Sequence, residues 1–297
     1  MSESKYALVT GACQGIGYQL SVELSKAGYR VIGCSPAKVI HLQKPLEDKY
    51  DLISIPLDIT KVEEIKAAAL KVNDITGGKL HVLYNNAGIS VIGPAIETSE
   101  EDLFNVFNVN VLGHINMTKY FAPQVINAKG TILFTSSIAG RAPLSWVSAY
   151  NASKAAIDQY ALTLHGEMKP FGVRVHSVIT GGVNTAICDP NLSAKLVDSY
   201  YNVPGVQDSL KASATMSRDV NISPEKYAKE IVADIQRKCD PGFNLYHGAR
   251  SYLMHWASRF LPLWFFEIAV QIHFKQFQVF RTIAKNVKQG IYSKKNE

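Results

Sequence analysis

Tyr150 and Lys154 lie four residues apart, the spacing of side chains that share one face of a helix. A free tyrosine is a poor acid at neutral pH, but a nearby ammonium group stabilises the phenolate and makes the phenol a usable proton donor. The alternative is an amphipathic helix with a solvated lysine. Ser137, upstream of the pair and at the end of an apolar run, favours a site for proton transfer.

A glycine-rich segment follows the first apolar run of the chain and precedes a helical pattern. It reads Thr10-Gly11-Ala12-Cys13-Gln14-Gly15-Ile16-Gly17. Gly11 would permit a tight turn, Gly15 the close approach of a pyrophosphate, and Gly17 close packing of the helix on the strand. Such a pattern can also mark only a tight turn. The strand before it and the helix after it favour a dinucleotide phosphate site.

Strand-like and helix-like segments alternate along the chain, which positions these residues. The apolar runs rich in β-branched residues are Ala7–Thr10, Arg30–Cys34, Asp51–Pro56, Val82–Asn85, Gly130–Thr135 and Val173–Ile179. Helical spacing of apolar residues is found over Tyr18–Ala27, Val62–Val72, Leu103–Ile126 and Ser148–Lys169. This order predicts an α/β fold with a doubly wound parallel sheet of the Rossmann-like type, in one domain, and ligands bound beyond the carboxyl ends of the strands.

The motifs resemble, in type and order, those of the short-chain dehydrogenase/reductase family. The glycine spacing G-x-x-x-G-x-G is followed by Asp58-Ile59-Thr60, Asn85-Asn86-Ala87-Gly88, Asn110, Ser136-Ser137, Tyr150 to Lys154, and Gly181-Gly182-Val183-Asn184-Thr185, where the family usually has Pro-Gly. The resemblance implies Ser137, Tyr150, Lys154 and Asn110 as catalytic residues. It implies cofactor binding by Gly11, Gly15, Ile16, Gly17, Asp58, Asn86, Tyr150, Lys154, Val183 and Thr185, with no metal.

The resemblance also implies a role for each catalytic residue. Hydride passes from a nicotinamide to a carbonyl carbon while Tyr150 protonates the carbonyl oxygen and Ser137 donates a hydrogen bond to it. Lys154 also bonds the nicotinamide ribose. Asn110 holds a water that connects Lys154 to solvent, or else it only kinks its helix or bonds the backbone.

The end of the second predicted strand bears on the choice between NADP(H) and NAD(H). An Asp or Glu there would bind a bare ribose 2′-hydroxyl, and an Arg would attract a 2′-phosphate. The stretch from Val31 to Lys38 has none of the three, but Ser35 and Lys38 can accommodate a phosphate. We therefore expect NADP(H), with NADH as the alternative.

The segment beyond Tyr246 is unusually aromatic, so we divide the chain into 1–245, the dinucleotide-binding domain, and 246–297, a C-terminal amphipathic segment. Polar Glu267, Gln271, Lys275 and Gln278 recur at helical intervals beside a broad apolar face. Arg259, Pro262 and Glu267 interrupt the run before the roughly 20 residues needed to span a bilayer. We expect it to lie in a membrane interface, its basic end near lipid phosphates. The alternative is a helix buried against the body or a dimer partner.

A narrower resemblance, to the fungal NADPH-dependent 1-acyldihydroxyacetone phosphate reductases, rests on three stretches and the aromatic tail. The stretches are Gly113–Met117, Leu164–Phe171 and Ile179–Val183, while Pro36-Ala37 replaces an expected basic pair. It implies reduction of the ketone of 1-acyl-dihydroxyacetone phosphate to 1-acyl-glycerol 3-phosphate, in glycerolipid synthesis at the cytosolic face of the endoplasmic reticulum and on lipid droplets. The alternative substrate is another hydrophobic carbonyl or alcohol, such as a steroid or retinoid.

Other classes of function are disfavoured. A lipid hydrolase with Ser137 as nucleophile would need a G-x-S-x-G turn, which the sequence lacks, and an inert scaffold would not need the four catalytic-type residues. The net charge of +6 is concentrated at the C-terminal end, so no nucleic-acid partner is expected. Four dispersed cysteines and the absence of a signal-like N-terminus favour a reducing compartment. A homo-oligomer remains possible.

Expectations follow for a loop and for further polar residues. The stretch 186–223 is expected to be a lid over the substrate. Cations available for an anionic headgroup are Arg141, Lys195, Lys211 and Arg218. We expect core positions for His114, His165 and His176, and solvated helix-face charges at Asp158 and Glu167.

Overall fold

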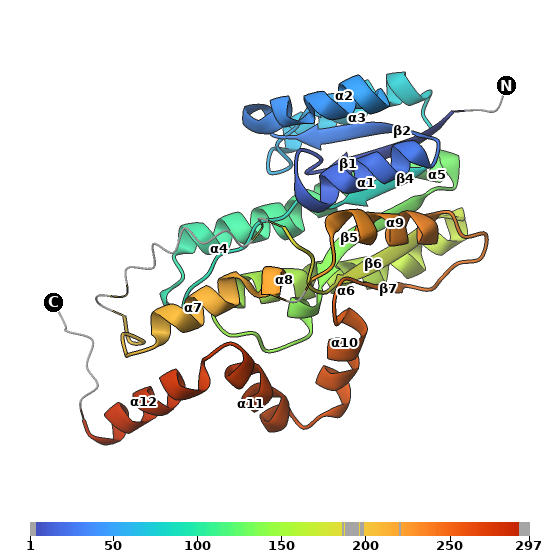
Figure 1. Ribbon diagram of the computed structural model, residues 1–297. Coiled ribbons are helices and arrows are strands. Elements are labelled where there is room, and N and C mark those ends of the chain that lie inside the picture. The colour runs from blue at the N-terminus through green and yellow to red at the C-terminus, as the bar shows by residue number, and fades with distance from the viewer. Residues whose placement is uncertain (1–3, 186, 188–195, 197–198, 220, 291–297) are drawn as a thin grey trace.

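The computed structural model describes residues 4–185, 187, 196, 199–219 and 221–290. Its centre is a sheet of seven parallel strands in the order β3-β2-β1-β4-β5-β6-β7 (Figure 1). The strands are β1 (Lys5–Thr10), β2 (Tyr29–Ser35), β3 (Ile53–Pro56), β4 (Val82–Asn85), β5 (Thr131–Ser137), β6 (Arg174–Thr180) and β7 (Asn244–His247). The predicted doubly wound parallel sheet is confirmed, because the chain order reverses between β1 and β4.

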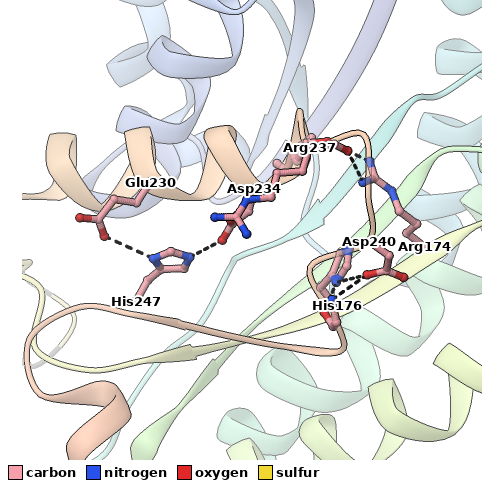
Figure 2. A network of polar contacts seen from close by, with 9 residues as sticks. Arg174, His176, Glu230, Asp234, Arg237, Asp240 and His247 are labelled. Carbon is pink, nitrogen blue, oxygen red and sulfur yellow. Dashed lines mark hydrogen bonds and ion pairs between the residues drawn. The ribbon is translucent and has the colours of Figure 1, made fainter.

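The edge strand β7 was not predicted from the sequence. It is only four residues long, and Leu245 is its one buried side chain. His247 fixes it to the neighbouring helix α9 (Pro224–Ile235), with its two ring nitrogens 2.7 Å from an Asp234 oxygen and 3.3 Å from a Glu230 oxygen (Figure 2). A short polar strand held by side-chain contacts has no apolar alternation, the signal on which strand prediction depends.

Helices cover both faces of the sheet. One face is packed by α1 (Gly15–Lys26), α2 (Lys44–Tyr50) and α9, and the other by α3 (Val62–Thr76), α5 (His114–Ala128) and α6 (Ser148–Met168). Their ends follow local chemistry: the Ser223 hydroxyl caps α9 before Pro224, and α3 ends at Gly77 with φ of +61°. The sheet therefore has an apolar core on each side, and the ends of its strands are left for a binding site.

The predicted helix over Leu103–Ile126 is divided in two by a turn. Helix α4 (Glu100–Phe107) passes into a π-helical turn, Asn108–Gly113, before α5 begins. Such turns arise where a residue is inserted into the α-helical ladder, and they are frequent at functional sites. Asn110 lies in this turn.

The C-terminal segment folds as three short helices, α10 (Ser251–Phe260), α11 (Leu263–His273) and α12 (Phe277–Lys288), below the body in Figure 1. Leu261-Pro262 ends α10, as expected before a proline, and Lys275 has φ of +56° between the last two helices. The polar stripe predicted from Glu267 to Gln278 is thus split between two helices. Among the described residues, no helix is long and apolar enough to cross a bilayer.

Two shorter helices, α7 (Val206–Ala214) and α8 (Met216–Asp219), lie between β6 and α9 in the chain. Helix α7 packs against α12, with Val206 and Leu210 in one buried cluster with Val279. The predicted lid, 186–223, therefore has helical structure in its second half, while most of its first half lies outside the described residues. The C-terminal segment and the lid region are packed together, far from each other in sequence.

Candidate active site

The glycine loop lies where strand order reverses, between β1 and its neighbours β2 and β4. Gly11 and Gly15 have φ of +68° and +56°, a region that favours glycine. A Cβ on Gly17 would lie 2.2 Å from the Gly11 carbonyl oxygen and 2.7 Å from Asn86 Nδ2. The predicted tight turn at Gly11 and the close helix packing at Gly17 are therefore confirmed.

Thr10 and Asn86 connect the loop to the end of β4. The Thr10 hydroxyl accepts hydrogen bonds from the backbone nitrogens of Asn86 and Ala87, at 2.9 and 3.0 Å, and Asn86 Nδ2 donates to the Thr10 carbonyl at 3.0 Å. The Thr135 hydroxyl, on β5, bonds Asn86 Oδ1 at 3.2 Å. Three strand ends are thereby held in a fixed relation, which positions whatever binds across them.

A cavity of about 940 Å³ opens along these strand ends and brings together most of the predicted site. Its lining includes Gly11, Gly15, Ile16, Asp58, Asn86, Ser137, Tyr150, Lys154, Val183 and Thr185. Gly17 and Asn110 are not part of the lining. Gly17 supports the loop from beneath, and Asn110 lies behind the catalytic helix.

Lys154 is buried, and it approaches Tyr150 as their spacing predicts. Its Nζ donates to the Thr135 carbonyl at 2.7 Å and lies 5.5 Å from the centre of the Tyr150 ring. Loss of hydration on burial lowers the pKa of Lys154 to about 8. The ammonium is therefore charged at neutral pH but close to its titration, beside the phenol that it is predicted to activate.

Ser137 ends β5 in the same cavity. Its hydroxyl accepts a hydrogen bond from the Ala139 backbone nitrogen at 3.1 Å, and the Thr180 carbonyl, at the end of β6, lies 3.5 Å away. Because an adjacent strand end and a loop amide hold the hydroxyl, it can present its proton to a carbonyl oxygen placed near Tyr150.

Asn110 supports this arrangement from the π-helical turn. Its Oδ1 accepts a hydrogen bond from the Ile89 backbone nitrogen, and its Nδ2 donates to the Ile89 carbonyl, both at 2.9 Å. The same Nδ2 donates to the Ser153 hydroxyl at 3.0 Å. The kink and the backbone bonds considered as its alternative role are thus both present. The water relay to Lys154 stays a prediction.

At the end of β2, Ser35 differs from the expectation that it accommodates a phosphate, because its hydroxyl already has a partner within the protein. The Ser35 hydroxyl is buried and accepts a hydrogen bond of 2.8 Å from the Gln43 side chain, which in turn accepts one from Ser54 at 2.9 Å. Lys38 is exposed and lines the cavity with Ser35 and Pro36. Gln43, fully buried, positions this end of the site, but a lone glutamine in the sequence gave no sign of it.

A nicotinamide dinucleotide fits the residues that are present. The loop after β1 leaves room for a phosphate where side chains would intrude, and the N-terminus of α1 faces that space. Asp58, with its carboxylate bonded by the Thr60 hydroxyl at 2.7 Å, lines the end of the cavity near β2. When bound, the cofactor would supply a hydride. The chain itself supplies the proton donor.

The structure contradicts the expected roles of Arg141, as a cation for a headgroup, and of Asp158, as a solvated charge. Asp158 is largely buried and pairs with Arg141 at 2.6 Å, and the Ser177 hydroxyl donates to it as well. The Arg141 guanidinium also donates to Asn244 at 2.7 Å and lies 3.1 Å from a ring nitrogen of His255. Arg141 is thus engaged in joining α6, β7 and α10, and Asp158 is not a solvated charge. Only the three-dimensional packing could reveal this cluster.

Two of the other candidate cations are among the described residues, and neither lines the cavity. Lys195 lies outside the described residues, while Lys211 on α7 and Arg218 on α8 are absent from the described lining. The expected core positions are confirmed for His114 and His176, which are buried, whereas His165 is only half-buried. The His114 Nε2 donates to the Ala87 carbonyl at 2.8 Å, and burial lowers its pKa to about 3, while His165 and His176 each contact a backbone carbonyl.

The C-terminal helices contribute cavity residues that sequence reasoning missed. Phe266, Val270 and Phe274, at successive positions of one helix face, are buried in a cluster with Tyr150 and Leu144. All five line the cavity, together with Arg250, Met254, Ala269 and His273. The spacing of the three apolar residues was visible in the sequence, where it was interpreted as part of the lipid-facing surface.

The chain is similar to known proteins in its family motifs, in its sequence and in its fold. The family model described as short chain dehydrogenase matches residues 5–195. The chain is 42% identical over 91% of both chains to a Saccharomyces cerevisiae protein named NADPH-dependent 1-acyldihydroxyacetone phosphate reductase, and 39% identical to a Schizosaccharomyces pombe protein of the same name over 63% of this chain and 62% of that one. A solved short-chain dehydrogenase from Streptomyces avermitilis superposes with a TM-score of 0.74 at 26% identity, covering 98% of this chain and 99% of the other.

Proposed function

Because the chain belongs to the short-chain dehydrogenase family, we propose that it uses NADPH to reduce the ketone of 1-acyl-dihydroxyacetone phosphate to 1-acyl-glycerol 3-phosphate, a lysophosphatidic acid. The observation that carries this proposal is the composition of the cavity. The cavity holds Ser137, Tyr150 and Lys154, and it is also walled by Phe266, Val270 and other apolar residues of the C-terminal helices. That combination suits a carbonyl group attached to an acyl chain.

The chain's own residues move the proton in this reaction. Tyr150 gives its phenolic proton to the ketone oxygen, and Ser137 stabilises that oxygen with a second hydrogen bond. The Lys154 ammonium, 5.5 Å from the tyrosine ring, stabilises the phenolate that remains. Asn110 holds the turn that faces Lys154, and we assign it the water through which the phenol is reprotonated.

NADPH is the proposed reductant over NADH. Lys38 and Ser35 line the cavity at the end of β2, and no acidic residue stands at positions 31–38 to repel a 2′-phosphate. The names of the two yeast relatives include NADPH. A Michaelis constant for NADH as low as that for NADPH would overturn this part of the proposal.

We also propose that the outer surface of α10 and α11 lies on a lipid surface, at the cytosolic face of the endoplasmic reticulum and on lipid droplets. Large apolar side chains are exposed there: Tyr252, Leu253, Trp256, Phe260, Leu261, Leu263, Trp264, Phe265, Ile268 and Ile272. Exposed cations flank them, at Arg259, Lys275, Arg281, Lys285 and Lys288. Aromatic residues beside lysines and arginines favour an interface with anionic lipid, and the same helices wall the cavity from inside.

The activity test compares substrates. Purified full-length protein in detergent should oxidise NADPH with 1-acyl-dihydroxyacetone phosphate at a kcat/KM far above that for the dephosphorylated ketone, a steroid ketone or retinal. Equal values for the phosphorylated and dephosphorylated ketones would favour the alternative, a general reductase of hydrophobic carbonyls. The apolar wall from Phe266 to Phe274 is compatible with both, so the headgroup decides between them.

The lipid-surface proposal is tested by flotation of the full chain with vesicles containing phosphatidylinositol. Replacing Phe260 and Trp264 with serine, both more than 60% exposed, should reduce binding by at least tenfold. Leu162→Ser is a matched control, because Leu162 is 48% exposed but lies on α6. If the double variant instead converts a dimer to a monomer without changing flotation, the face is a contact between two copies of the chain.

A further inference from the structure

The cavity contains a cation to which no role has yet been assigned. Three Lys or Arg side chains belong to its described lining: Lys38, Lys154 and Arg250. Lys154 is buried beside Tyr150, and Lys38 lies at the end of β2. Arg250 precedes α10, and its guanidinium has no hydrogen-bond or ion-pair partner among the residues that the structure describes.

Backbone packing holds Arg250 close to the catalytic end of the cavity. A Cβ on Gly181 would lie 2.2 Å from the Ala249 carbonyl oxygen and 2.9 Å from the Ser251 nitrogen, so the residues on either side of Arg250 press directly on Gly181. Any side chain at position 181 would therefore clash with this backbone. Gly181 follows Thr180, whose carbonyl lies 3.5 Å from the Ser137 hydroxyl.

The two exposed cations lie at opposite ends of the cavity. In the sheet, β2 and β6 are separated by β1, β4 and β5, which at a spacing of about 4.8 Å per strand places their ends about 19 Å apart. Lys38 is therefore at the far end from Ser137, whereas Arg250 lies beside β6, which pairs with the strand that ends in Ser137.

The backbone of Arg250 adopts a conformation that L-residues avoid. Its φ of +59° is left-handed, and the favoured residues there are glycine, asparagine and aspartate. Asp51, Lys129, Trp146 and Lys275 share such a backbone, but Arg250 is the one of the five that lines the cavity, where strained residues often serve binding. The next residue of α10 on the same side is Met254, which also lines the cavity.

We propose that Arg250 is the cation that recognises the phosphate group of the substrate. The inference rests on the proposed function, in which the reacting ketone and the phosphorus atom are separated by three covalent bonds, on the order of 4 Å. A phosphate must then lie close to Ser137 and Tyr150, at the end of the cavity where Arg250 is. Arginine presents a planar fork of donors that matches a phosphate, which lysine cannot reproduce.

The experiment measures one ratio: kcat/KM for 1-acyl-dihydroxyacetone phosphate divided by kcat/KM for the dephosphorylated ketone. Arg250→Ala should lower this ratio by about 10- to 100-fold, the usual effect of removing a charge-assisted hydrogen-bonding partner. Arg250→Lys should restore it only in part. Lys211→Ala, a change of surface charge away from the cavity, should leave the ratio at the wild-type value.

A second variant separates a binding role from a folding role. Arg250→Gly removes the same charge and relieves the left-handed strain, so its melting temperature should rise by about 2 °C while the ratio falls as for Arg250→Ala. A fall of the ratio only in variants that also unfold at lower temperature would overturn the proposal.

The remaining outcomes are also distinct. If the wild-type ratio is near one, the proposed function is wrong and Arg250 has no phosphate to bind. If the wild-type ratio is high and Arg250→Ala leaves it unchanged, the function stands and the assignment of Arg250 fails. If Arg250→Ala weakens the binding of NADPH without substrate, measured by nucleotide fluorescence, by as much as it lowers the ratio, the phosphate that it contacts belongs to the cofactor.

Discussion

The two halves of the cavity are built in different ways. The half formed by β1, β2, β4 and β5 is held by short hydrogen bonds between adjacent strand ends, such as those that Asn86 donates to Thr10. The half formed by α10 and α11 is held mainly by apolar packing of Phe266, Val270 and Phe274 against the Tyr150 region. The first half is specified to a fraction of an ångström by directional bonds, whereas the second depends on shape and volume.

The two halves therefore suit different tasks: one positions the reacting groups, and the other accommodates the apolar part of the substrate. Directional bonds suit the reacting groups, which must meet a ketone at fixed distances. Apolar packing tolerates variation in the length of a bound chain, since each methylene contributes a similar free energy of burial. The Arg141 cluster joins the two halves, because it bonds Asp158 on the catalytic helix and contacts His255 on α10.

The largest effect is expected for a substitution in the half held by directional bonds, at the phenol of Tyr150. Tyr150→Phe removes the proposed acid without removing the ring, so turnover should fall by about 10²- to 10⁴-fold while NADPH still binds. Stopped-flow or steady-state NADPH oxidation measures the first quantity and nucleotide fluorescence the second. Retained turnover would mean that another residue is the acid.

The inner face of α11 and the outer face of α10 can be compared directly. Phe266 is 4% exposed and Phe260 is 73% exposed. Phe266→Ala should weaken the docking of the C-terminal helices by about 3 kcal/mol or more, seen in thermal unfolding and faster hydrogen exchange over 251–288. Phe260→Ala should change stability by less than about 0.5 kcal/mol and affect lipid binding alone. Equal effects on stability would contradict the two-faced description.

The directional half is tested at a glycine. Gly17→Ala places a methyl group 2.2 Å from the Gly11 carbonyl oxygen, so the loop must shift, and we expect NADPH affinity to fall by about 10- to 100-fold, the equivalent of about 1 to 3 kcal/mol. Gly166→Ala is the matched control. Its Cβ would meet nothing within 4 Å in the last turn of α6, and it should be neutral or slightly stabilising. Calorimetric titration with NADPH measures both.

The pH dependence should follow Lys154. Its pKa is lowered to about 8 by burial, so the ammonium is charged below that pH and loses its proton as the pH rises through it. Since the charge assists Tyr150, kcat/KM should fall about tenfold between pH 7 and pH 9. A profile measured from pH 6 to pH 10 at saturating NADPH tests this, and a rate that stays flat to pH 10 would exclude Lys154 as the group that titrates.

The sequence predicted much of the fold and the position of the chemistry. Six of the seven strands were placed within about three residues, and the residues from Ser137 to Lys154 meet in one cavity with the glycine loop. These motifs are local: each sits at the end of an apolar run, and parallel strands bring such ends to one edge. The strand β7 and the π-helical turn at Asn110 were missed, because polar edge strands and helix insertions carry no periodic signal.

The sequence was less informative about charges. Arg141 was considered for a headgroup and Asp158 for a solvated helix face, yet they pair with each other at 2.6 Å. Arg250, in contrast, was not considered, and it lines the cavity. A charged residue shows its type in the sequence but not its partner, because the partners of Arg141 lie up to 114 positions away and are chosen by packing.

The amino-acid sequence by itself determined the alternating elements, the glycine loop and the Tyr150–Lys154 spacing, since all three depend on residues within a few positions of one another. It also determined that the C-terminal segment is amphipathic. Which side of α11 faces Tyr150, and which faces outward, is set by the packing of the folded chain. Helical periodicity groups apolar side chains on a surface, but what covers that surface depends on contacts with distant parts of the chain.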